Sequence, residues 1–259
     1  MPRIKKTKDY DKFVFVDFNR DINRSLQSNL SKSAEVLEPR LDLYPLIVKP
    51  LDKKYADASY PDGKHEIWDG QHRFIVARQR DAFIYYQIDE NDSLKPEHLA
   101  YLQTSKGWNL DDYLHKFCVL ANKLGNGTYQ DYKIYDGFKR RSGWSHNNVI
   151  ALLVSNTKGA VASFKEGHFK IERSIAESND IIDMIGDFGS YFKHYKSRSF
   201  VTAMIKIITK VDGYDHKRMI SKMEYLSEKL VKCPDATTYV MLLEKLYNFK
   251  ATGDYVRFI

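Results

Sequence analysis

Residues 65–78 read HEIWDGQHRFIVAR, and the rest of the chain is organised around this stretch. The apolar residues before Asp69 are typical of the end of a strand, Asp69-Gly70 predicts a tight turn, and the residues from His72 onward predict a helix. The first amides of a helix have no partner within it, so they attract an anion. The guanidinium of Arg73 matches two phosphate oxygens at once. The stretch therefore predicts a strand–turn–helix phosphate site. The alternative is a capped turn in which Arg73 pairs with a surface acid.

The segments around this turn predict a small mixed α and β domain. Apolar runs predict strands, and four-residue spacing predicts a helix before Pro39. The strands are expected at 13–16, 44–48, 67–68 and 83–88, with helices at 24–35 and from 72 onward. Residues 1–9 are polar and basic, which predicts a mobile tail. We therefore expect a tail over 1–9 and a folded domain over 10–92.

The order of these elements and the hexapeptide Asp69 to Phe74 resemble the N-terminal domain of ParB-like proteins. That fold is shared with sulfiredoxin and with a free-serine kinase. The resemblance covers residues 10–92, and Asn19-Arg20 matches it more loosely. It suggests a DGQHR-motif member of this superfamily, of phage or plasmid type. The resemblance implies a small mixed sheet and a pocket for nucleotide phosphates.

The resemblance also implies roles for individual side chains. Gly70 is the turn glycine, and Gln71 faces the reacting end. The Asn19-Arg20 turn supplies a second arginine. In sulfiredoxin a redox cysteine stands where this chain has Gln71, so sulfinic-acid reduction is not expected. The expected cofactor-binding residues are Asn19, Arg20, Gly70, Gln71, His72 and Arg73.

The expected cofactor is a nucleoside triphosphate, CTP or ATP, together with Mg²⁺. ParB proteins that segregate chromosomes bind and hydrolyse CTP, and other members of the lineage are nucleases. Either reaction would need a carboxylate and a metal ion. The catalytic candidates are Asp69, His72 and Arg73. The spacing of the histidines and aspartates here matches no common protein metal site, so we predict none.

Composition narrows the class of protein. With 259 residues, of which 43% are hydrophobic, the chain is long enough for one large or two ordinary domains. No apolar stretch approaches the ~20 residues that span a bilayer, and the N-terminus lacks an apolar signal segment. Cys118 and Cys233 are far apart in sequence, and Cys118 fits a buried thiol better than half of a disulfide. We therefore expect a cytoplasmic protein without a membrane partner.

Charge is unevenly distributed along the chain, whose net charge is +7. Residues 1–92 hold 16 basic and 16 acidic side chains, whereas the remainder holds 25 basic and 18 acidic ones. A basic second half predicts a polyanionic partner, and DNA is the one we expect. The alternative is a generic basic surface.

After residue 92 helical signals replace strand signals, so residues 93–259 predict an all-α domain. A charged segment at 164–171, with Gly167 at its middle, predicts a small hairpin or loop. The helices are expected at 94–104, 109–124, 129–141, 145–153, 173–185, 199–211, 215–232 and 234–249. The fold class is thus α+β: a small ParB/sulfiredoxin-like mixed-sheet domain followed by an all-α domain.

Residues 129–153 predict a helix, a glycine-containing turn and a second helix, which fits a helix-turn-helix. ParB proteins place such a motif after the N-terminal domain. The first residues of the second helix would reach bases, and the basic turn would meet phosphates. A second basic cluster with aromatic residues follows at 193–198. The expected DNA contacts are Lys139, Arg140, Arg141, Ser145, His146, Asn147, Lys193, Lys196 and Arg198. The alternative is an ordinary helix pair with a solvated turn.

These observations favour a ParB-like DNA-binding protein with a nucleotide pocket and a basic helical domain. Two alternatives stay open. One is a ParB-like nuclease or nucleotide hydrolase. The other is a protein-interaction module that inhibits a host factor. The later helices, rich in apolar residues, could also form a homodimer.

Overall fold

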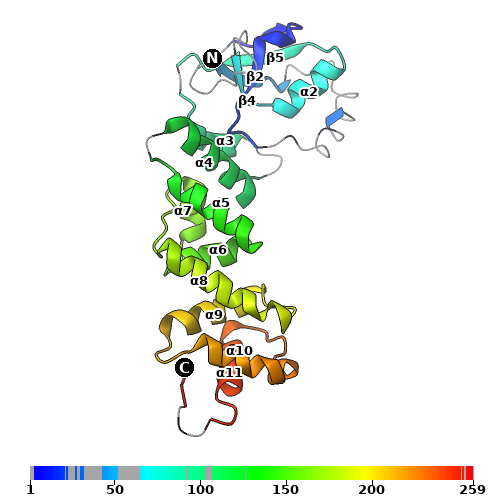
Figure 1. The fold of residues 1–259 in the computed structure, drawn as a ribbon. Helices are drawn as coiled ribbons and strands as arrows, with labels where there is room; N and C mark the ends of the chain where they lie inside the picture. Colours follow the sequence, from blue (N-terminus) through cyan, green and yellow to red (C-terminus); the bar gives the residue numbers. More distant parts are fainter. Residues whose placement is uncertain are drawn as a thin grey trace. The chain divides into compact units, whose positions relative to one another are not determined.

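The computed structural model describes residues 3–20, 22, 27, 30–31, 43–51, 65–91, 93–102, 107–125, 127–251, 253 and 255–258. The chain forms two compact units, Met1–Tyr132 and Lys133–Ile259. Figure 1 labels most of their helices and strands. The helix predicted at 24–35 falls almost entirely outside the described residues. The division predicted after residue 92 falls inside the first unit and stays a prediction.

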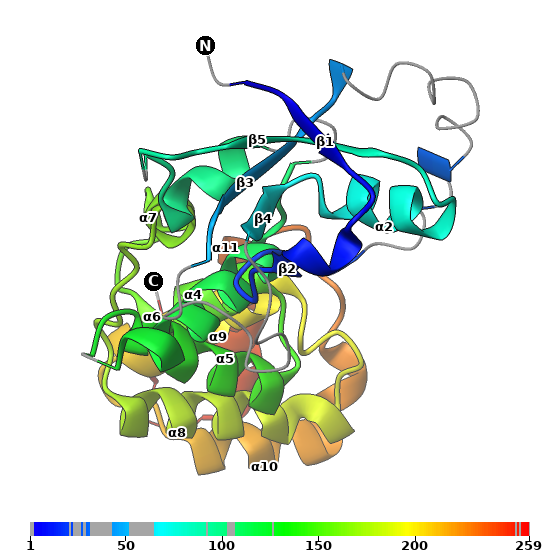
Figure 2. The ribbon, with the colours of Figure 1, turned by 90° about the horizontal axis from the view of Figure 1, so that it is seen from above.

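A mixed sheet forms the first unit's framework, as predicted, and it has five strands among the described residues. Its strand order is β1-β5-β3-β4-β2. Strand β4 pairs antiparallel with β3 and parallel with β2, while β5 pairs parallel with β3 and antiparallel with β1 (Figure 2). The strands are β1 (Lys5–Thr7), β2 (Phe13–Phe15), β3 (Leu46–Pro50), β4 (His65–Asp69) and β5 (Ile84–Ile88).

Strand β4 is buried on both faces, because its side chains alternate between two packed layers. On one face, Ile67 joins a core with Phe74 of α2 (Gln71–Gln79). On the other face, the Trp68 ring meets the Phe18 ring edge-on at 5.6 Å between centroids. The buried core of the first face is Phe13, Leu46, Val48, Ile67, Phe74, Ala77, Ala82, Ile84 and Tyr86.

Strand β1 lies within the segment expected to be a mobile tail, and the sequence analysis did not anticipate it. Lys6 pairs with Tyr85 across the β1–β5 ladder. After the strand, Lys8 forms an ion pair with Asp81 at 2.9 Å, and the Tyr10 hydroxyl donates to the Ala82 carbonyl at 2.9 Å. A strand with two lysines lacks the apolar alternation that reveals strands in a sequence. The lysines also suit an edge position, where they discourage pairing with another chain.

Helix α4 (Leu110–Leu124) begins and ends where local signals predict. The Asn109 side chain accepts hydrogen bonds from the amides of Asp111 and Asp112, which caps the first turn. Gly125, with φ +62°, ends the helix. Ahead of α4, the chain forms η3 (Pro96–His98) and α3 (Leu99–Leu102) instead of one longer helix.

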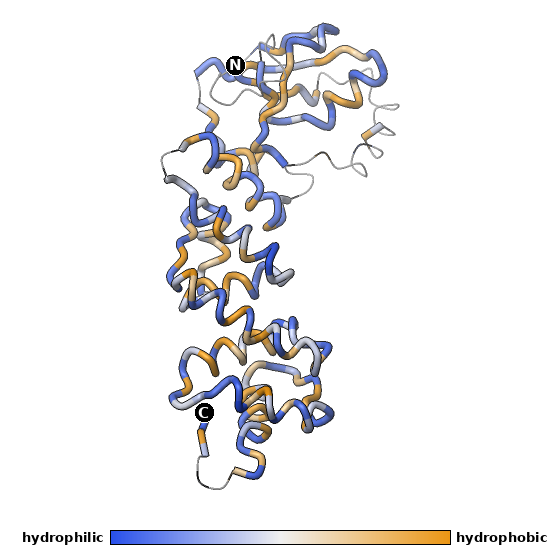
Figure 3. Tube along the Cα trace, in the orientation of Figure 1, coloured by the Kyte–Doolittle hydropathy of each residue, from blue (hydrophilic) through white to orange (hydrophobic). Residues whose placement is uncertain are grey.

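All regular elements in the described residues of the second unit are helices, as predicted. Helix α5 begins in the first unit and continues into the second. Hydrophobic and hydrophilic residues alternate along these helices in Figure 3, as packing of amphipathic helices requires. None of the helices in the described part of the chain has the length and apolar character to traverse a bilayer. The helices are α5 (Gln130–Ser142), α6 (His146–Leu153), α7 (Ala160–Glu166), α8 (Ile175–Gly186), α9 (Arg198–Lys210), α10 (His216–Leu226) and α11 (Ala236–Tyr247), with η4 (Asp187–Ser190) and η5 (Ser227–Lys229).

The hairpin or loop predicted at 164–171 is half wrong. Helix α7 occupies the segment as far as Glu166, and only the residues after Gly167 are irregular. Left-handed glycines flank α7, Gly159 at φ +78° and Gly167 at φ +85°. A helix of seven residues shows too few turns for its period to be visible in the sequence.

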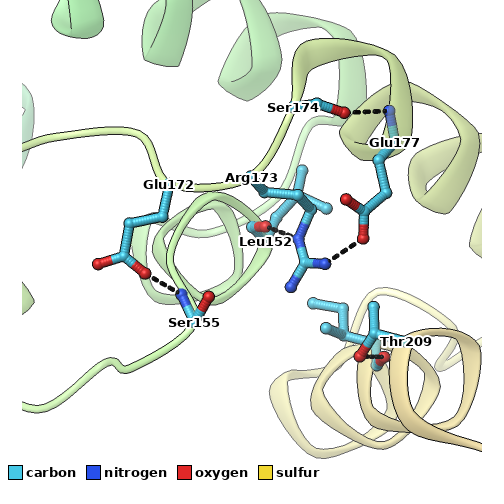
Figure 4. Close-up of polar contacts among 8 residues, drawn as sticks. Leu152, Ser155, Glu172, Arg173, Ser174, Glu177 and Thr209 are labelled. Carbon is cyan, nitrogen blue, oxygen red and sulfur yellow. Dashed lines mark hydrogen bonds and ion pairs between the residues drawn. The ribbon is translucent and has the colours of Figure 1, made fainter.

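An arginine clamp holds the irregular segment after α7 against the end of α6 (Figure 4). The Arg173 Nε donates to the Leu152 carbonyl at 2.7 Å, and its Nη1 pairs with Glu177. The backbone amides of Glu172 and Arg173 both donate to the Leu153 carbonyl, at 2.9 and 3.1 Å. The last carbonyls of a helix lack partners within it and carry partial negative charge. The clamp therefore completes the C-terminal end of α6.

Candidate functional site

The turn between β4 and α2 requires a glycine at position 70. Gly70 has φ +94°, and a Cβ there would lie 2.5 Å from Leu46 Cδ2 and 2.8 Å from Arg73 Nη2. The Gly70 carbonyl accepts the hydrogen bond of the Phe74 amide at 2.9 Å. The structure thus brings the Arg73 guanidinium directly over the turn, where the sequence analysis placed a phosphate contact.

Arg73 already has an acidic partner at this turn. Its Nη2 donates to Asp69 Oδ2 at 2.7 Å, and both side chains are largely buried. The alternative expected a capped turn with Arg73 paired to a surface acid, whereas here the acid is Asp69 of the turn itself and no side chain of the described residues caps the helix. The Nε of Arg73 is buried and has no hydrogen-bond partner among the described residues. A buried donor left without an acceptor is unusual, and an anion would satisfy it.

A second polar turn lies against the first. The Gln71 side-chain amide donates to the Arg20 carbonyl at 2.7 Å. The Asn19 amide donates to the Trp68 carbonyl at 3.3 Å, and the Asn19 side-chain oxygen accepts from the Arg20 amide at 2.9 Å. The structure therefore brings the Asn19-Arg20 turn to the β4–α2 turn. Gln71 is buried and holds the backbone of that turn, so its amide nitrogen does not face an open reacting end.

His72 and Arg20 are also buried beside this turn. Burial is the main cause that lowers the pKa of His72, the positive charge of Arg20 lowers it further, and Asp69 opposes both. Burial likewise lowers the pKa of Arg20, against the influence of Asp112 and Asp69. A histidine with a lowered pKa is neutral at neutral pH, so His72 offers an anion a hydrogen bond and no positive charge.

The carboxylate proposed for catalysis, Asp69, is the one that binds Arg73. Among the residues that the structure describes, no group of three or more histidine, cysteine, aspartate or glutamate side chains is placed to hold a metal ion. The catalytic roles of Asp69, His72 and Arg73, and the use of Mg²⁺, stay predictions.

Two of the three basic residues at the end of α5 are engaged by acids. Arg140 pairs with Asp136 one turn earlier, at 2.7 Å. Arg141 binds both carboxylate oxygens of Asp183, at 2.6 and 2.8 Å, and also contacts Asn179. Their charges are partly neutralised, which weakens their expected role as phosphate contacts.

Helix α6 is unlike the recognition helix that the sequence suggested. Five of its eight residues are buried: Asn148, Val149, Ile150, Leu152 and Leu153. The His146 ring stacks on the Tyr135 ring, and its Nδ1 lies 2.9 Å from the Tyr135 hydroxyl. Only Ser145 and Asn147 of the predicted base-reading residues are exposed. A recognition helix must present one face to the groove, so a helix-turn-helix is not confirmed.

The structure joins the α5–α6 turn to the basic segment at 193–198. The Asn148 side-chain amide donates to the Lys196 carbonyl at 3.0 Å. The Lys196 ammonium lies over the turn, 3.3 Å from where a Cβ would stand on Gly143. We call the exposed group Gly143, Ser145, Asn147, Lys193, Lys196 and Arg198 the basic surface. Among the described residues, no acid pairs with its three cations.

The sequence analysis missed a buried lysine in α4. Lys116 is 1% exposed, and its ammonium lies 4.3 Å from the centre of the Phe117 ring and 5.5 Å from those of Trp108 and Tyr113. Burial lowers the pKa of Lys116 to about 8. A lysine between apolar helix positions resembles a solvated side chain in sequence. Its burial becomes visible only in the structure, where the Trp108 ring packs near the Lys116 ammonium.

Comparison with known proteins returns no relative. No family model matches the chain, and neither the curated proteins nor the solved structures contain a match.

Proposed function

We propose that this chain is a ParB-like DNA-binding protein whose second unit contacts DNA through the basic surface. Its first unit would hold a nucleotide or phosphate at the Asp69–Arg73 turn. One observation carries the proposal: the hydrogen bond from Asn148 to the Lys196 carbonyl joins two basic segments that lie about fifty residues apart in sequence.

The distribution of charge supports DNA as the partner. Residues 133–259 hold 21 basic and 14 acidic side chains, which accounts for the whole net charge of +7, while residues 1–132 hold 20 of each. Lys193, Lys196 and Arg198 are exposed and lack acidic neighbours among the described residues. Phosphate contacts of this kind give affinity with little sequence preference. The burial of α6 also favours contact with the backbone over reading of bases.

The nucleotide part of the proposal is supported by the β4–α2 turn. The unpaired Nε of Arg73 offers a donor for a phosphate oxygen, and Arg20 adds positive charge nearby. A phosphate would share Arg73 with Asp69, since the guanidinium carries five N–H groups. No chemical step at this turn is proposed.

Titration of the full chain with a labelled duplex at several salt concentrations tests DNA binding. We expect affinity to fall steeply with salt, with a slope of about 0.9 for each phosphate contact. Replacing Lys193, Lys196 and Arg198 together by Ala should reduce both the affinity and that slope.

The matched control replaces Lys158, Lys165 and Lys206, which are exposed elsewhere on the second unit, by Ala. It removes the same charge and should lower the affinity much less. If both triple variants lose the same DNA affinity, the binding depends on overall charge and not on the basic surface. No duplex binding at low salt would remove the proposed function.

The nucleotide site is tested by thermal unfolding with each of the four nucleoside triphosphates and Mg²⁺. A ligand that binds only the folded state raises the unfolding temperature. The shift should disappear in Arg73→Ala and persist in Arg78→Ala, because Arg78 is exposed on the same helix. If no nucleotide shifts the wild type, the nucleotide part fails and the DNA part is unaffected.

The two other hypotheses, a nuclease or nucleotide hydrolase and an inhibitor of a host factor, gain no specific support from the geometry. Incubation of the protein with labelled DNA, nucleotides and Mg²⁺ checks the first. Recovery of a defined protein from nuclease-treated host lysate checks the second.

A further inference from the structure

An aromatic ring lies next to the basic surface, and contacts with the DNA backbone alone do not use it. Tyr195 stands between Lys193 and Lys196 in the sequence and is half-buried. The ring lies against the backbone of Gly189, where a Cβ would stand 3.3 Å from it. Its hydroxyl has no hydrogen-bond partner among the described residues. The ring is therefore held by packing, and no polar bond fixes its edge.

The neighbouring ammonium places a phosphate site beside this ring. Lys196 Nζ lies over the Tyr195 ring, 5.5 Å from its centre, and also beside the Gly143 turn. A base stacked on this ring would take the place of the ammonium, which would then turn toward the adjoining phosphate. Helix α6 begins directly after the Gly143 turn, and Ser145 makes no side-chain capping bond to its first amides. A phosphate at Lys196 and a base on Tyr195 would be within reach of one nucleotide, whose phosphate and base are joined through one sugar.

Stacking of this kind needs an unpaired base. In a duplex the faces of the bases are covered by their neighbours, whereas in a single strand each base can lie on an aromatic ring. Residues 191–198, YFKHYKSR, combine basic and aromatic side chains, as single-strand binding proteins do. Helix α6, which would have to read a duplex, is mostly buried.

We propose that the basic surface takes single-stranded DNA, with a base stacked on Tyr195 and the adjoining phosphate at Lys196 over the Gly143 turn. This inference rests on the proposed function and specifies its substrate. Lys193 and Arg198 extend the phosphate path on either side of this nucleotide.

Fluorescence anisotropy with the full chain tests the inference. The probes are a labelled 20-nucleotide oligothymidine and a labelled duplex of the same length, at equal ionic strength. The single strand should bind more tightly than the duplex. Tyr195→Ala should weaken single-strand binding at least about fivefold, as expected for loss of one stacked base. Tyr195→Phe should bind like the wild type, because stacking does not need the hydroxyl.

The matched control is Tyr225→Ala. Tyr225 is 58% exposed on α10 and also has a lysine beside its ring, Lys222 at 5.9 Å. This variant should keep single-strand affinity. Lys196→Ala should lower the salt slope for the single strand by about 0.7, and Lys206→Ala, on the exposed face of α9, should not. Circular dichroism confirms that each variant is folded.

The outcomes separate the two proposals. If the duplex binds as tightly as the single strand and Tyr195→Ala changes neither, the inference is overturned while DNA binding stands. If neither probe binds at low salt, DNA binding and the inference both fail. Equal losses in Tyr195→Ala and Tyr225→Ala would also overturn it, because the effect would then not belong to this surface.

Discussion

At the scale of single residues, the buried ammonium of Lys116 makes stability depend on pH. The folded chain releases its proton near pH 8, whereas the unfolded chain keeps it up to the ordinary value of 10.5. Between these values the unfolded state binds more protons, so the free energy of unfolding rises with pH. Below pH 8 both states are charged and the burial penalty is fully present.

Lys116→Met should therefore stabilise the protein at pH 7, by about 3 kcal/mol at most. The advantage over the wild type should shrink as pH rises from about 8 toward 10.5. Urea unfolding at pH 7, 8, 9 and 10 measures it, with Lys206→Met as a surface control. A constant difference across this range would contradict the assignment.

Two left-handed glycines allow strain and steric collision to be separated. Gly125→Ala introduces only backbone strain, of about 1 kcal/mol, since nothing lies within 4 Å of its Cβ position. Gly70→Ala adds collisions with Leu46 and Arg73, so it should cost at least about 1 kcal/mol more. Denaturant unfolding of both variants measures the difference. Similar costs would show that the β4–α2 turn relaxes freely.

Single-residue signals in the sequence identify the glycine turn but not the state of its arginine. Gly70 is predictable because the turn depends on one residue and its neighbours. The sequence does not decide whether Arg73 pairs with an acid or contacts a phosphate, since an arginine at this turn suits both. The role of Gln71 depends on Arg20, which is 51 positions away, and no local pattern records it.

At the scale of elements, Arg173 closes the C-terminal end of α6. Arg173→Ala should destabilise the protein by about 1.5–3 kcal/mol, because it removes the hydrogen bond from a charged group to the partly buried Leu152 carbonyl. Arg173→Lys should recover part of this, since an ammonium lacks the planar fork. Thermal unfolding measures both variants.

Arg140→Ala provides the comparison for that prediction. Arg140 is 79% exposed and pairs with Asp136 on its own helix, so its removal should cost at most about 0.5 kcal/mol. If Arg140→Ala and Arg173→Ala cost the same, the clamp contributes no more than a surface ion pair.

The sequence predicts best those helices that have clear capping and termination signals. α4 has a capping asparagine, acids in its first turn and a terminating glycine, all of which act locally. The sequence does not reveal α7, because the helix is too short to show its period. It does not reveal β1 either, because this strand forms by pairing with the edge of β5 and has no apolar alternation of its own. The sequence does not reveal the packing of α6 against its neighbours either, so it does not show that most of this helix is buried.

At the scale of the whole molecule, the two units should respond to different ligands. Single-stranded DNA should protect backbone amides near 143–147 and 189–198 from hydrogen exchange, and a bound nucleotide should protect those near 69–74. We expect DNA to bind the second unit because the whole net positive charge lies in residues 133–259. Exchange measured by mass spectrometry on the full chain checks this. DNA protection spread evenly over residues 65–80 would contradict it.

The hydrogen bond that Asn148 gives to the Lys196 carbonyl comes from a side chain that is 1% exposed. The loop bearing the cations is thus anchored from within, and its shape exists before any ligand arrives. The conformational entropy lost on association is then lost almost entirely by the nucleic acid and not by the protein. Calorimetry should accordingly find a small change in heat capacity on binding, because little apolar area is removed from water. Association kinetics should show a diffusion-limited on-rate with no slow conformational phase.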